Sequence, residues 1–444
     1  MAAPRGRRSP CKSEARGEIP RGFQKAGAVI KARHKISPRQ NFLWALWHGG
    51  FLAFGTALTQ PTTVIAAFVA DLTGSTIWVG GLTTVLTLAG ALPQIFVARW
   101  IEPRRYKMPF LLFAIHLRIV SWGALAWLIF ALGAERPQLL AWALVGLLAV
   151  FYAGGGMGGV PYTDIIGKII PPGRRGAFFG GRQAIAGPLA VGASLLARHF
   201  LAAAKYPDNY AFLFLAATVA LLVASLGFWM IREPPRAKTD GRMPPWREYF
   251  VQLKGTVRRL KVLVLVQMLT GFSLMAFPFY IVYARRELGA PQEAVAWFML
   301  SQVVGGVLAN LLWAWLVDKY GSRCMLMVCA CISTLTPLLA IALGRMGWQG
   351  ILPVMFLVGA IFNGRAVGFS SAVLELSPED ERPTYSALNK VLIIPVAFLS
   401  LVGGLLLQHW SYPALFLLAA GFIGAGAVAT RWLPDKSQRQ EVSD

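Results

Sequence analysis

Twelve long apolar stretches are the feature of this sequence that most constrains its fold. A helix needs about 20 consecutive apolar residues to cross the hydrocarbon core of a bilayer. The expected spans lie near residues 41–68, 76–99, 108–132, 138–161, 177–201, 209–231, 263–284, 292–317, 324–344, 350–373, 384–407 and 412–432. We therefore predict an all-α polytopic membrane protein with 12 transmembrane helices in two six-helix bundles, a 6+6 repeat.

The composition agrees with a membrane protein. Of the 444 residues, 56% are hydrophobic and 14% are charged, whereas a soluble chain carries about 25% charged residues. The formal net charge of +23 does not indicate a nucleic-acid partner, because the basic residues lie in the gaps between the apolar stretches.

No motif in the sequence predicts an enzyme, a cofactor or a metal site. There is no GxxxxGK[ST] sequence for a nucleotide phosphate. The chain has four cysteines, and Cys324, Cys329 and Cys331 lie on one apolar stretch without the spacing of a zinc site. A membrane-bound transferase would need acid and base residues gathered at one membrane face, and none are found.

The positions of Lys and Arg predict the orientation, because cytoplasmic loops are enriched in these residues. They cluster in alternate gaps, around 99–107, 168–175, 232–261 and 319–323, whereas Arg285 and Arg286 depart from the pattern. Both termini are therefore expected in the cytoplasm, with the chain as a multi-pass integral membrane protein. The expected parts are a basic cytoplasmic tail 1–40, a bundle 41–231, a cytoplasmic linker 232–262, a bundle 263–433 and a tail 434–444.

The two halves resemble one another in sequence. Pro61 and Pro278 interrupt the first and seventh stretches, and IIPPGRRGAFFGGRQ at 169–183 aligns without gaps to LSPEDERPTYSALNK at 376–390. Parallel six-helix repeats are typical of transporters whose halves rock around a site near the bilayer midplane.

One segment resembles a known family signature. Residues 314–323 read AWLVDKYGSR, which fits G-x-x-x-D-[RK]-x-G-x-[RK] except that Ala314 replaces the first Gly. Together with twelve spans and the repeat, this resembles the major facilitator superfamily. In the first half ARWIEPRRYK occupies the equivalent place, with Glu102 in the acidic role. The resemblance implies alternating access and transport of a small solute. PYTDIIGKIIPPGRRGAFFGGRQ at 161–183 also resembles bacterial members, which implies a bacterial inner (plasma) membrane. We expect a monomer.

Charged residues near the predicted cytoplasmic ends are candidates for a gate. We expect Asp164 to pair with Arg182 and Glu375 with Lys390, either to gate or to pack the helices. Lys319 and Arg323 can anchor to anionic lipid at the cytoplasmic face or pair with acids of the other half. The full set of gate candidates is Glu102, Arg105, Asp164, Arg182, Asp318, Lys319, Arg323, Glu375 and Lys390.

Polar residues inside the spans are candidates for the substrate site, because an ionisable group at the centre of a helix costs about 2.5–3.5 kcal/mol to insert. These are His48, Gln60, His116, Arg118, Gln267, Tyr280, Gln302, Asn310, Asn363 and Arg365. Arg118 lies near mid-span and no acid lies at that depth, which favours an organic anion or amphipathic solute. Arg118 as a clamp to carbonyls, and the Gln and Asn residues as helix–helix contacts, are the structural alternatives.

The predicted function is a secondary active or facilitative transporter of a small solute. His48 or His116 could titrate near neutral pH and serve a coupling proton, although a hydrogen-bonding role inside the bundle is the alternative; another coupling ion, or none, is also compatible. A non-transporting receptor or scaffold on the same fold is the second hypothesis, with the basic tail as its docking surface.

Overall fold

The computed structural model describes residues 38–101, 104, 106–133, 135–235, 259–377 and 382–434. Nearly all of the predicted basic tail and most of the predicted linker lie outside these residues. Glu102 and Arg105, two of the gate candidates, also lie outside them.

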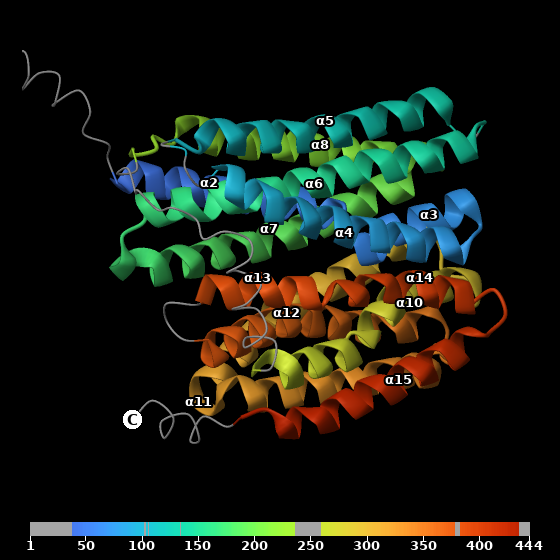
Figure 1. Cartoon of the computed structure of the whole chain (residues 1–444). Coiled ribbons are helices and arrows are strands. Elements are labelled where there is room, and N and C mark those ends of the chain that lie inside the picture. The colour runs from blue at the N-terminus through green and yellow to red at the C-terminus, as the bar shows by residue number, and fades with distance from the viewer. Residues whose placement is uncertain are drawn as a thin grey trace, which may run out of the picture.

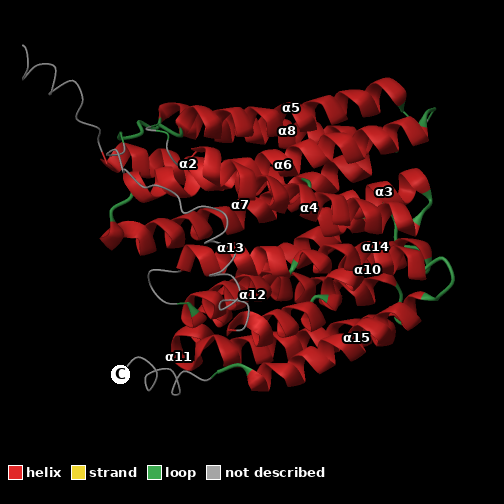
Figure 2. Ribbon diagram, in the orientation of Figure 1, coloured by secondary structure: helices red, strands yellow, loops and turns green. Residues whose placement is uncertain are grey.

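The described chain is helical and forms two bundles that lie side by side (Figures 1 and 2). The first contains α2 (Pro38–Leu58), η1 (Pro61–Ile65), α3 (Ala66–Thr73), α4 (Thr76–Ile101), α5 (Met108–Leu132), α6 (Pro137–Ile169), η2 (Pro172–Arg174), α7 (Arg175–Ala203) and α8 (Asp208–Met230). The second contains α10 (Phe272–Arg286), α11 (Ala294–Gly344), η3 (Trp348–Gly350), α12 (Ile351–Leu376), α13 (Arg382–Leu392), η5 (Ile394–Phe398), α14 (Leu399–Leu406), α15 (Tyr412–Ala429) and η6 (Thr430–Trp432). Residues 259–270 are helical and lead into α10.

Among the described residues, ten helices are long and apolar enough to cross a membrane. One of them, α11, has 51 residues and is broken at Gly321, whose φ of 80° and ψ of 173° are not helical. Glycine adopts a positive φ without the penalty that a side chain brings, so this residue separates two spans. The run α13–η5–α14 supplies one more, so the arrangement agrees with the predicted twelve spans.

The helix ends of the two bundles form two opposite faces of the protein. We call the end at which α2 begins and α15 finishes the basic face, because Lys107, Lys168, Arg175 and Arg323 lie there. It is on the left in Figure 1. The other end, formed by the loops between α3 and α4, α7 and α8, and α10 and α11, is the opposite face.

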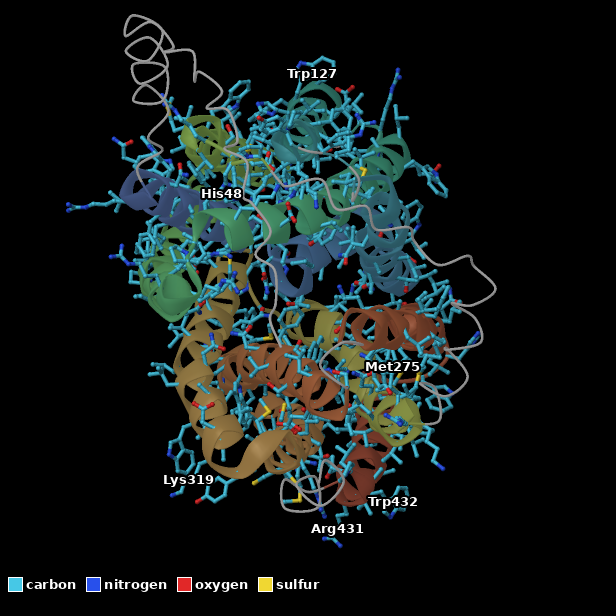
Figure 3. The ribbon with its side chains drawn as sticks, turned by 60° about the vertical axis from the view of Figure 1, so that its left-hand side comes forward. His48, Trp127, Met275, Lys319, Arg431 and Trp432 are labelled. Atoms are coloured by element: carbon cyan, nitrogen blue, oxygen red, sulfur yellow. The ribbon has the colours of Figure 1, made fainter. Side chains whose placement is uncertain are left out.

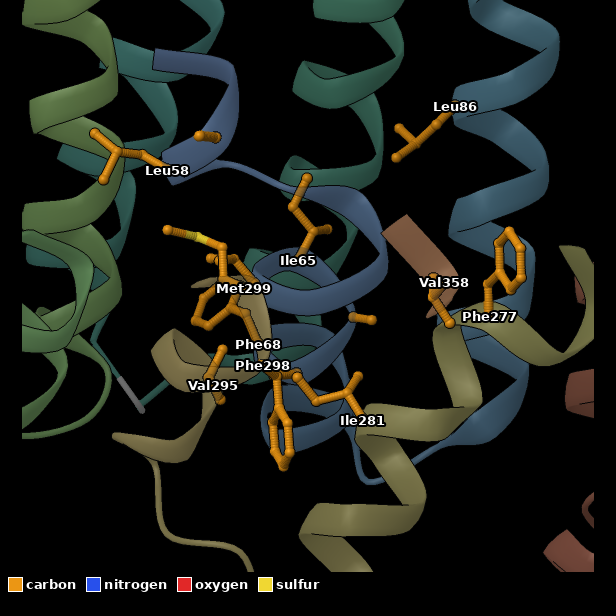
Figure 4. Packing of buried hydrophobic residues seen from close by; sticks show 14 of the residues in the cluster. Leu58, Ile65, Phe68, Leu86, Phe277, Ile281, Val295, Phe298, Met299 and Val358 are labelled. Atoms are coloured by element: carbon orange, nitrogen blue, oxygen red, sulfur yellow. The ribbon is translucent and has the colours of Figure 1, made fainter. Parts of the chain in front are cut away.

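An apolar plug joins the two bundles toward the opposite face. Phe68 from α3 lies beside Ile281 from α10 and Phe298 and Met299 from α11 (Figure 4). All four side chains are buried. Because residues from both bundles share this cluster, the bundles are held together at this end.

Candidate functional site

An ionic latch joins the two bundles on the side of the apolar plug that is nearer to the opposite face. The Arg285 Nη2 atom donates to both carboxylate oxygens of Asp71, at 2.9 and 3.1 Å, and its Nη1 donates to the Ala290 carbonyl at 2.6 Å. Arg286 donates to the Ala70 carbonyl at 3.1 Å. Asp71 belongs to the first bundle and both arginines to the second, so these contacts hold the opposite face shut.

The latch accounts for the two arginines that depart from the predicted charge pattern. Arg285 and Arg286 lie at the end of a span where the topology rule expects few basic residues, and each donates a hydrogen bond to a group of the other bundle. The sequence analysis did not place these residues, or Asp71, in a gate. The presence of two arginines at the face where few are expected was the signal that could have identified the latch.

A seam between α4 and the consecutive helices η5 and α14 continues the closed interface. Thr76 Oγ1 donates to the Gly404 carbonyl at 2.8 Å, and Thr84 Oγ1 donates to the Ala397 carbonyl at 2.8 Å. Gly80 lies directly against the Ser400 carbonyl, so that a β-carbon at this position would collide with it. Small residues let membrane helices approach this closely, and here they join one bundle to the other.

A broken first span brings polar groups to the same interface. Pro61 lacks a backbone N–H, and the chain passes from α2 through Gln60 into the π-helical turn η1. The next residue, Thr62, accepts from Gln302 Nε2 at 2.8 Å and lies 3.1 Å from Gln302 Oε1. Gln302, one of the candidate substrate-site residues, therefore joins the second bundle to the first.

The two candidate histidines bind main-chain carbonyls. His48 Nδ1 lies 3.0 Å from the Ala224 carbonyl, and the buried ring packs edge-on against Phe228, so it joins α2 to α8. His116 Nδ1 lies 2.7 Å from the Leu112 carbonyl in its own helix. These contacts agree with the hydrogen-bonding alternative.

Several other candidates contribute to packing inside the second bundle. Asn363 Nδ2 donates to the Gly306 carbonyl at 3.0 Å and ties α12 to α11, and Tyr280 is buried against Phe416. Gln267 is buried, and its side-chain oxygen has no hydrogen-bond partner among the described residues. Asn310 lies half-buried on α11 of the same bundle, whereas Gln60 lies half-buried between α2 and η1 of the first bundle.

The Arg118 side chain crosses the neighbouring helix α6 at a place where two glycines leave room for it. Its side chain runs along Gly154 and Gly155 of α6, and its guanidinium lies 4.4 Å above the Phe151 ring. The Nε atom is buried, and no described group accepts a hydrogen bond from it. The cation–π contact stabilises the charge and leaves hydrogen-bonding capacity unused.

Three further cations lie within the spans. Arg182 donates to the Tyr162 hydroxyl at 2.7 Å, Arg365 donates to the Thr270 hydroxyl at 2.7 Å, and Lys390 donates to Gln94 Oε1 at 2.9 Å. The last contact joins α13 to α4 and thus one bundle to the other. Within the described ranges, neither these cations nor Arg118 forms an ion pair.

The carboxylates near the basic face have other partners than the sequence analysis expected. Asp164 binds Lys107 at 3.1 Å and Lys168 at 2.7 Å, and Lys168 also binds Glu233 at 2.7 Å. Lys168 follows Asp164 by one helical turn, where side chains of opposite charge meet readily. The predicted pair of Asp164 with Arg182 is therefore wrong, because Arg182 points to Tyr162 instead.

In the second bundle, Glu375 accepts from the Ser322 hydroxyl at 2.6 Å and the Ser322 N–H at 3.2 Å. It thus caps the helix that starts after the Gly321 break. Since Lys390 binds Gln94, the predicted pair of Glu375 with Lys390 is also wrong. The remaining gate candidates flank the same break in α11: Asp318, Lys319, whose ammonium lies 5.3 Å from the Trp315 ring centroid, and Arg323.

Glu233 caps the start of α5, a role that the sequence analysis missed. Its carboxylate accepts from the N–H groups of Lys107 and Met108, with shortest distances of 2.8 Å. A carboxylate at a helix N-terminus satisfies unpaired donors and interacts favourably with the helix dipole. Its side chain is almost fully buried, so it fixes the first residues after α8 to the basic face.

Replacing Glu233 with Ala is expected to destabilise the first bundle by about 1–3 kcal/mol, because Lys168 and two backbone donors lose an acceptor. The measurement is the thermal unfolding midpoint of the purified protein in detergent. The control is Glu135→Ala, which removes an exposed carboxylate from the opposite face. Equal midpoints for the two variants would contradict the capping role.

The second half of the chain is similar to a known protein family. Residues 263–443 match the family model described as Major Facilitator Superfamily. No curated protein is significantly similar to the chain in sequence.

Solved transporters share the fold over nearly their whole length. A variant of the nucleoside transporter NupG superposes with a TM-score of 0.70 at 12% identity, covering 88% of this chain and 99% of its own. The D-xylose–proton symporter gives a TM-score of 0.64 at 16% identity, covering 86% and 96%.

A bacterial homologue of the iron transporter ferroportin has been solved in two states. Its inward-facing form gives a TM-score of 0.63 at 14% identity, and its outward-facing form gives 0.56 at 16%. Both forms cover 89% of this chain and 98% of their own. The fold is therefore shared, at identities too low to carry over a substrate.

Proposed function

We propose that this chain is a member of the major facilitator superfamily, whose model matches residues 263–443, and that it carries a small anionic or amphipathic solute across the membrane by alternating access. The family match over the second half of the chain and the fold that it shares with solved transporters support the transporter part of this proposal. The charge of the solute is the new element, and the cations inside the spans are the observation that carries it.

The proposed state is open toward the cytoplasm. The latch, the plug and the α4–α14 seam all close the opposite face, and the chain superposes better on the inward-facing than on the outward-facing ferroportin homologue. The basic face would then be cytoplasmic, in agreement with the enrichment of Lys and Arg in cytoplasmic loops.

Four cations on the spanning helices favour an anionic solute. Arg118, Arg182, Arg365 and Lys390 contact aromatic rings, hydroxyls and an amide, and no ion pair neutralises them within the described residues. A charge at mid-membrane costs about 2.5–3.5 kcal/mol, so a carboxylate or phosphate bound to Arg118, which lies near mid-span, would offset part of that cost. Arg118, with its unpaired Nε, is the best placed of the four to bind it.

Uptake into proteoliposomes tests the proposal. The panel consists of labelled carboxylates and phosphate esters beside neutral and cationic analogues of the same size, with and without a pH gradient to detect a coupling proton. Anions are expected to be transported in preference to their analogues. Preferential uptake of the cationic analogues would refute the anionic assignment.

The Arg118→Gln variant is expected to lose about tenfold in apparent affinity for the transported anion, since a hydrogen bond to a charged group contributes about 1.5–3 kcal/mol. The matched control, Arg174→Gln, removes an exposed arginine at the basic face. Thermal unfolding of both variants checks that each is folded. If the two variants transport alike, Arg118 does not bind the solute.

A further inference from the structure

A pocket of about 490 Å³ opens on the basic face of the second bundle. It lies between the start of the helix that leads into α10, the Gly321 break in α11, and the end of α15. Its lining residues are Arg259, Lys261, Val262, Leu263, Arg323, Leu376, Arg431, Trp432, Leu433 and Pro434. Arg431 and Trp432 lie at the edge of the second bundle that points away from the first (Figure 3), so the pocket is distinct from the interface between the bundles.

Four cations from three helices surround this pocket. Arg259 and Lys261 come from the first of these helices, Arg323 from the second and Arg431 from the third. Neither Asp nor Glu occurs among the described residues that line it. Arg and Lys together recognise phosphate oxygens by charge-assisted hydrogen bonds, so the pocket has the chemistry to bind a phosphate-bearing anion.

The rest of the lining is apolar and lies at the membrane surface. Leu263 and Leu433 are buried, whereas the Trp432 ring is 65% exposed at the end of an apolar span. Tryptophan at such a position is typical of the interface between headgroups and acyl chains. A ligand that fits both the cations and this ring has an anionic head and an apolar tail.

We propose that this pocket binds the phosphate-bearing headgroup of an anionic membrane lipid, with its acyl chains along Trp432. Basic pockets between transmembrane helices at the cytoplasmic side commonly bind anionic headgroups. The four cations line one pocket, so the proposed lipid site is confined to it. Lys319, a basic residue nearby on α11, does not line the pocket and instead lies over the Trp315 and Tyr320 rings. It also involves α13 indirectly, since Arg259 donates to the Tyr385 hydroxyl at 3.5 Å.

The test is a thermal-shift titration of the purified full-length protein in detergent. The three probes are short-chain phosphatidylglycerol, which is anionic, short-chain phosphatidylcholine, which is zwitterionic, and inorganic phosphate. Phosphatidylglycerol is expected to stabilise the protein at concentrations at which the other two have no effect. Stabilisation by inorganic phosphate equal to that by phosphatidylglycerol would overturn the lipid assignment, because the acyl chains would then contribute nothing.

The triple variant Arg259→Gln, Lys261→Gln, Arg431→Gln is expected to bind phosphatidylglycerol at least about tenfold more weakly, given roughly 1 kcal/mol per basic residue near anionic lipid. The matched control, Arg39→Gln, Arg174→Gln, Arg232→Gln, removes three exposed cations of the first bundle. Should the triple variant not fold, the single variants Lys261→Gln and Arg431→Gln carry the same comparison. Equal responses of pocket and control variants would overturn the site.

Discussion

Replacing Asp71 with Asn is expected to open the opposite face and to raise the accessibility of the interface about tenfold. A hydrogen bond between charged groups contributes about 1.5–3 kcal/mol, and about 1.4 kcal/mol shifts an equilibrium tenfold. Asp71 accepts two such contacts from Arg285 across the bundles. The closed state therefore loses stability relative to the outward-open state, while the fold of each bundle is unaffected.

The measurement is the rate at which an impermeant thiol reagent, added from the opposite face, modifies a reporter cysteine. Val295→Cys is a suitable reporter, because Val295 is fully buried beside the plug. It is introduced after the four native cysteines are changed to Ser. The control Arg136→Gln removes an exposed charge from the same face.

Charge reversal sharpens the test of the latch. Arg285→Asp alone should open the face as Asp71→Asn does, and combining it with Asp71→Arg should partly restore protection. Restoration stays partial because an aspartate cannot donate to the Ala290 carbonyl, as Arg285 does. If the double reversal labels as fast as the single variants, or if none of them differs from the control, the latch does not hold this face.

Gly80→Ala is expected to have a comparably large effect on conformation and a small one on folding. A β-carbon at Gly80 collides with the Ser400 carbonyl, and these two residues belong to different bundles. The clash is relieved when the bundles separate at the opposite face, so labelling of the Val295→Cys reporter should rise about tenfold or more, given overpacking energies of about 1–3 kcal/mol. The thermal unfolding midpoint should change little.

Gly359→Ala provides the contrasting case. A β-carbon there collides with the Gln302 carbonyl, and both residues lie in the second bundle, where rocking cannot separate them. We expect destabilisation of about 1–3 kcal/mol or more, visible as a lower unfolding midpoint. Gly192→Ala is the matched control, because nothing lies near its added β-carbon. Equal effects of Gly80→Ala and Gly359→Ala on unfolding would contradict this distinction.

Much of the fold was predictable because hydropathy is a local property. Apolar length alone predicted the spans, including the gap between residues 317 and 324 that lies within α11, and Pro61 marked a break in the first span. The structure departs from the prediction mainly in the helix ends. Helix α6, for example, continues to Ile169, several residues beyond the predicted end at 161, since Asp164 and Lys168 are stabilised by partners at the basic face.

The residues of the candidate site could be selected from the sequence, but most of their contact partners could not. Polar residues inside spans were predicted as substrate-site candidates, with contacts to other helices as the alternative, and the contacts of His48, Gln302 and Asn363 agree with that alternative. Their partners are mostly main-chain carbonyls, which sequence patterns do not distinguish. The pairs of Asp164 and Glu375 were predicted from their places in the repeat, and this ignored the direction in which each side chain leaves its helix.

The sequence by itself determined the number of spans, the repeat and the enrichment of basic residues at one face, because each depends on residues close together in the chain. Only the tertiary structure decided which charges meet. Asp71 and Arg285 are 214 positions apart, and their contact depends on the rotation of two helices and the tilt between two bundles. The same holds for the basic pocket, whose cations come from three helices that no local pattern connects.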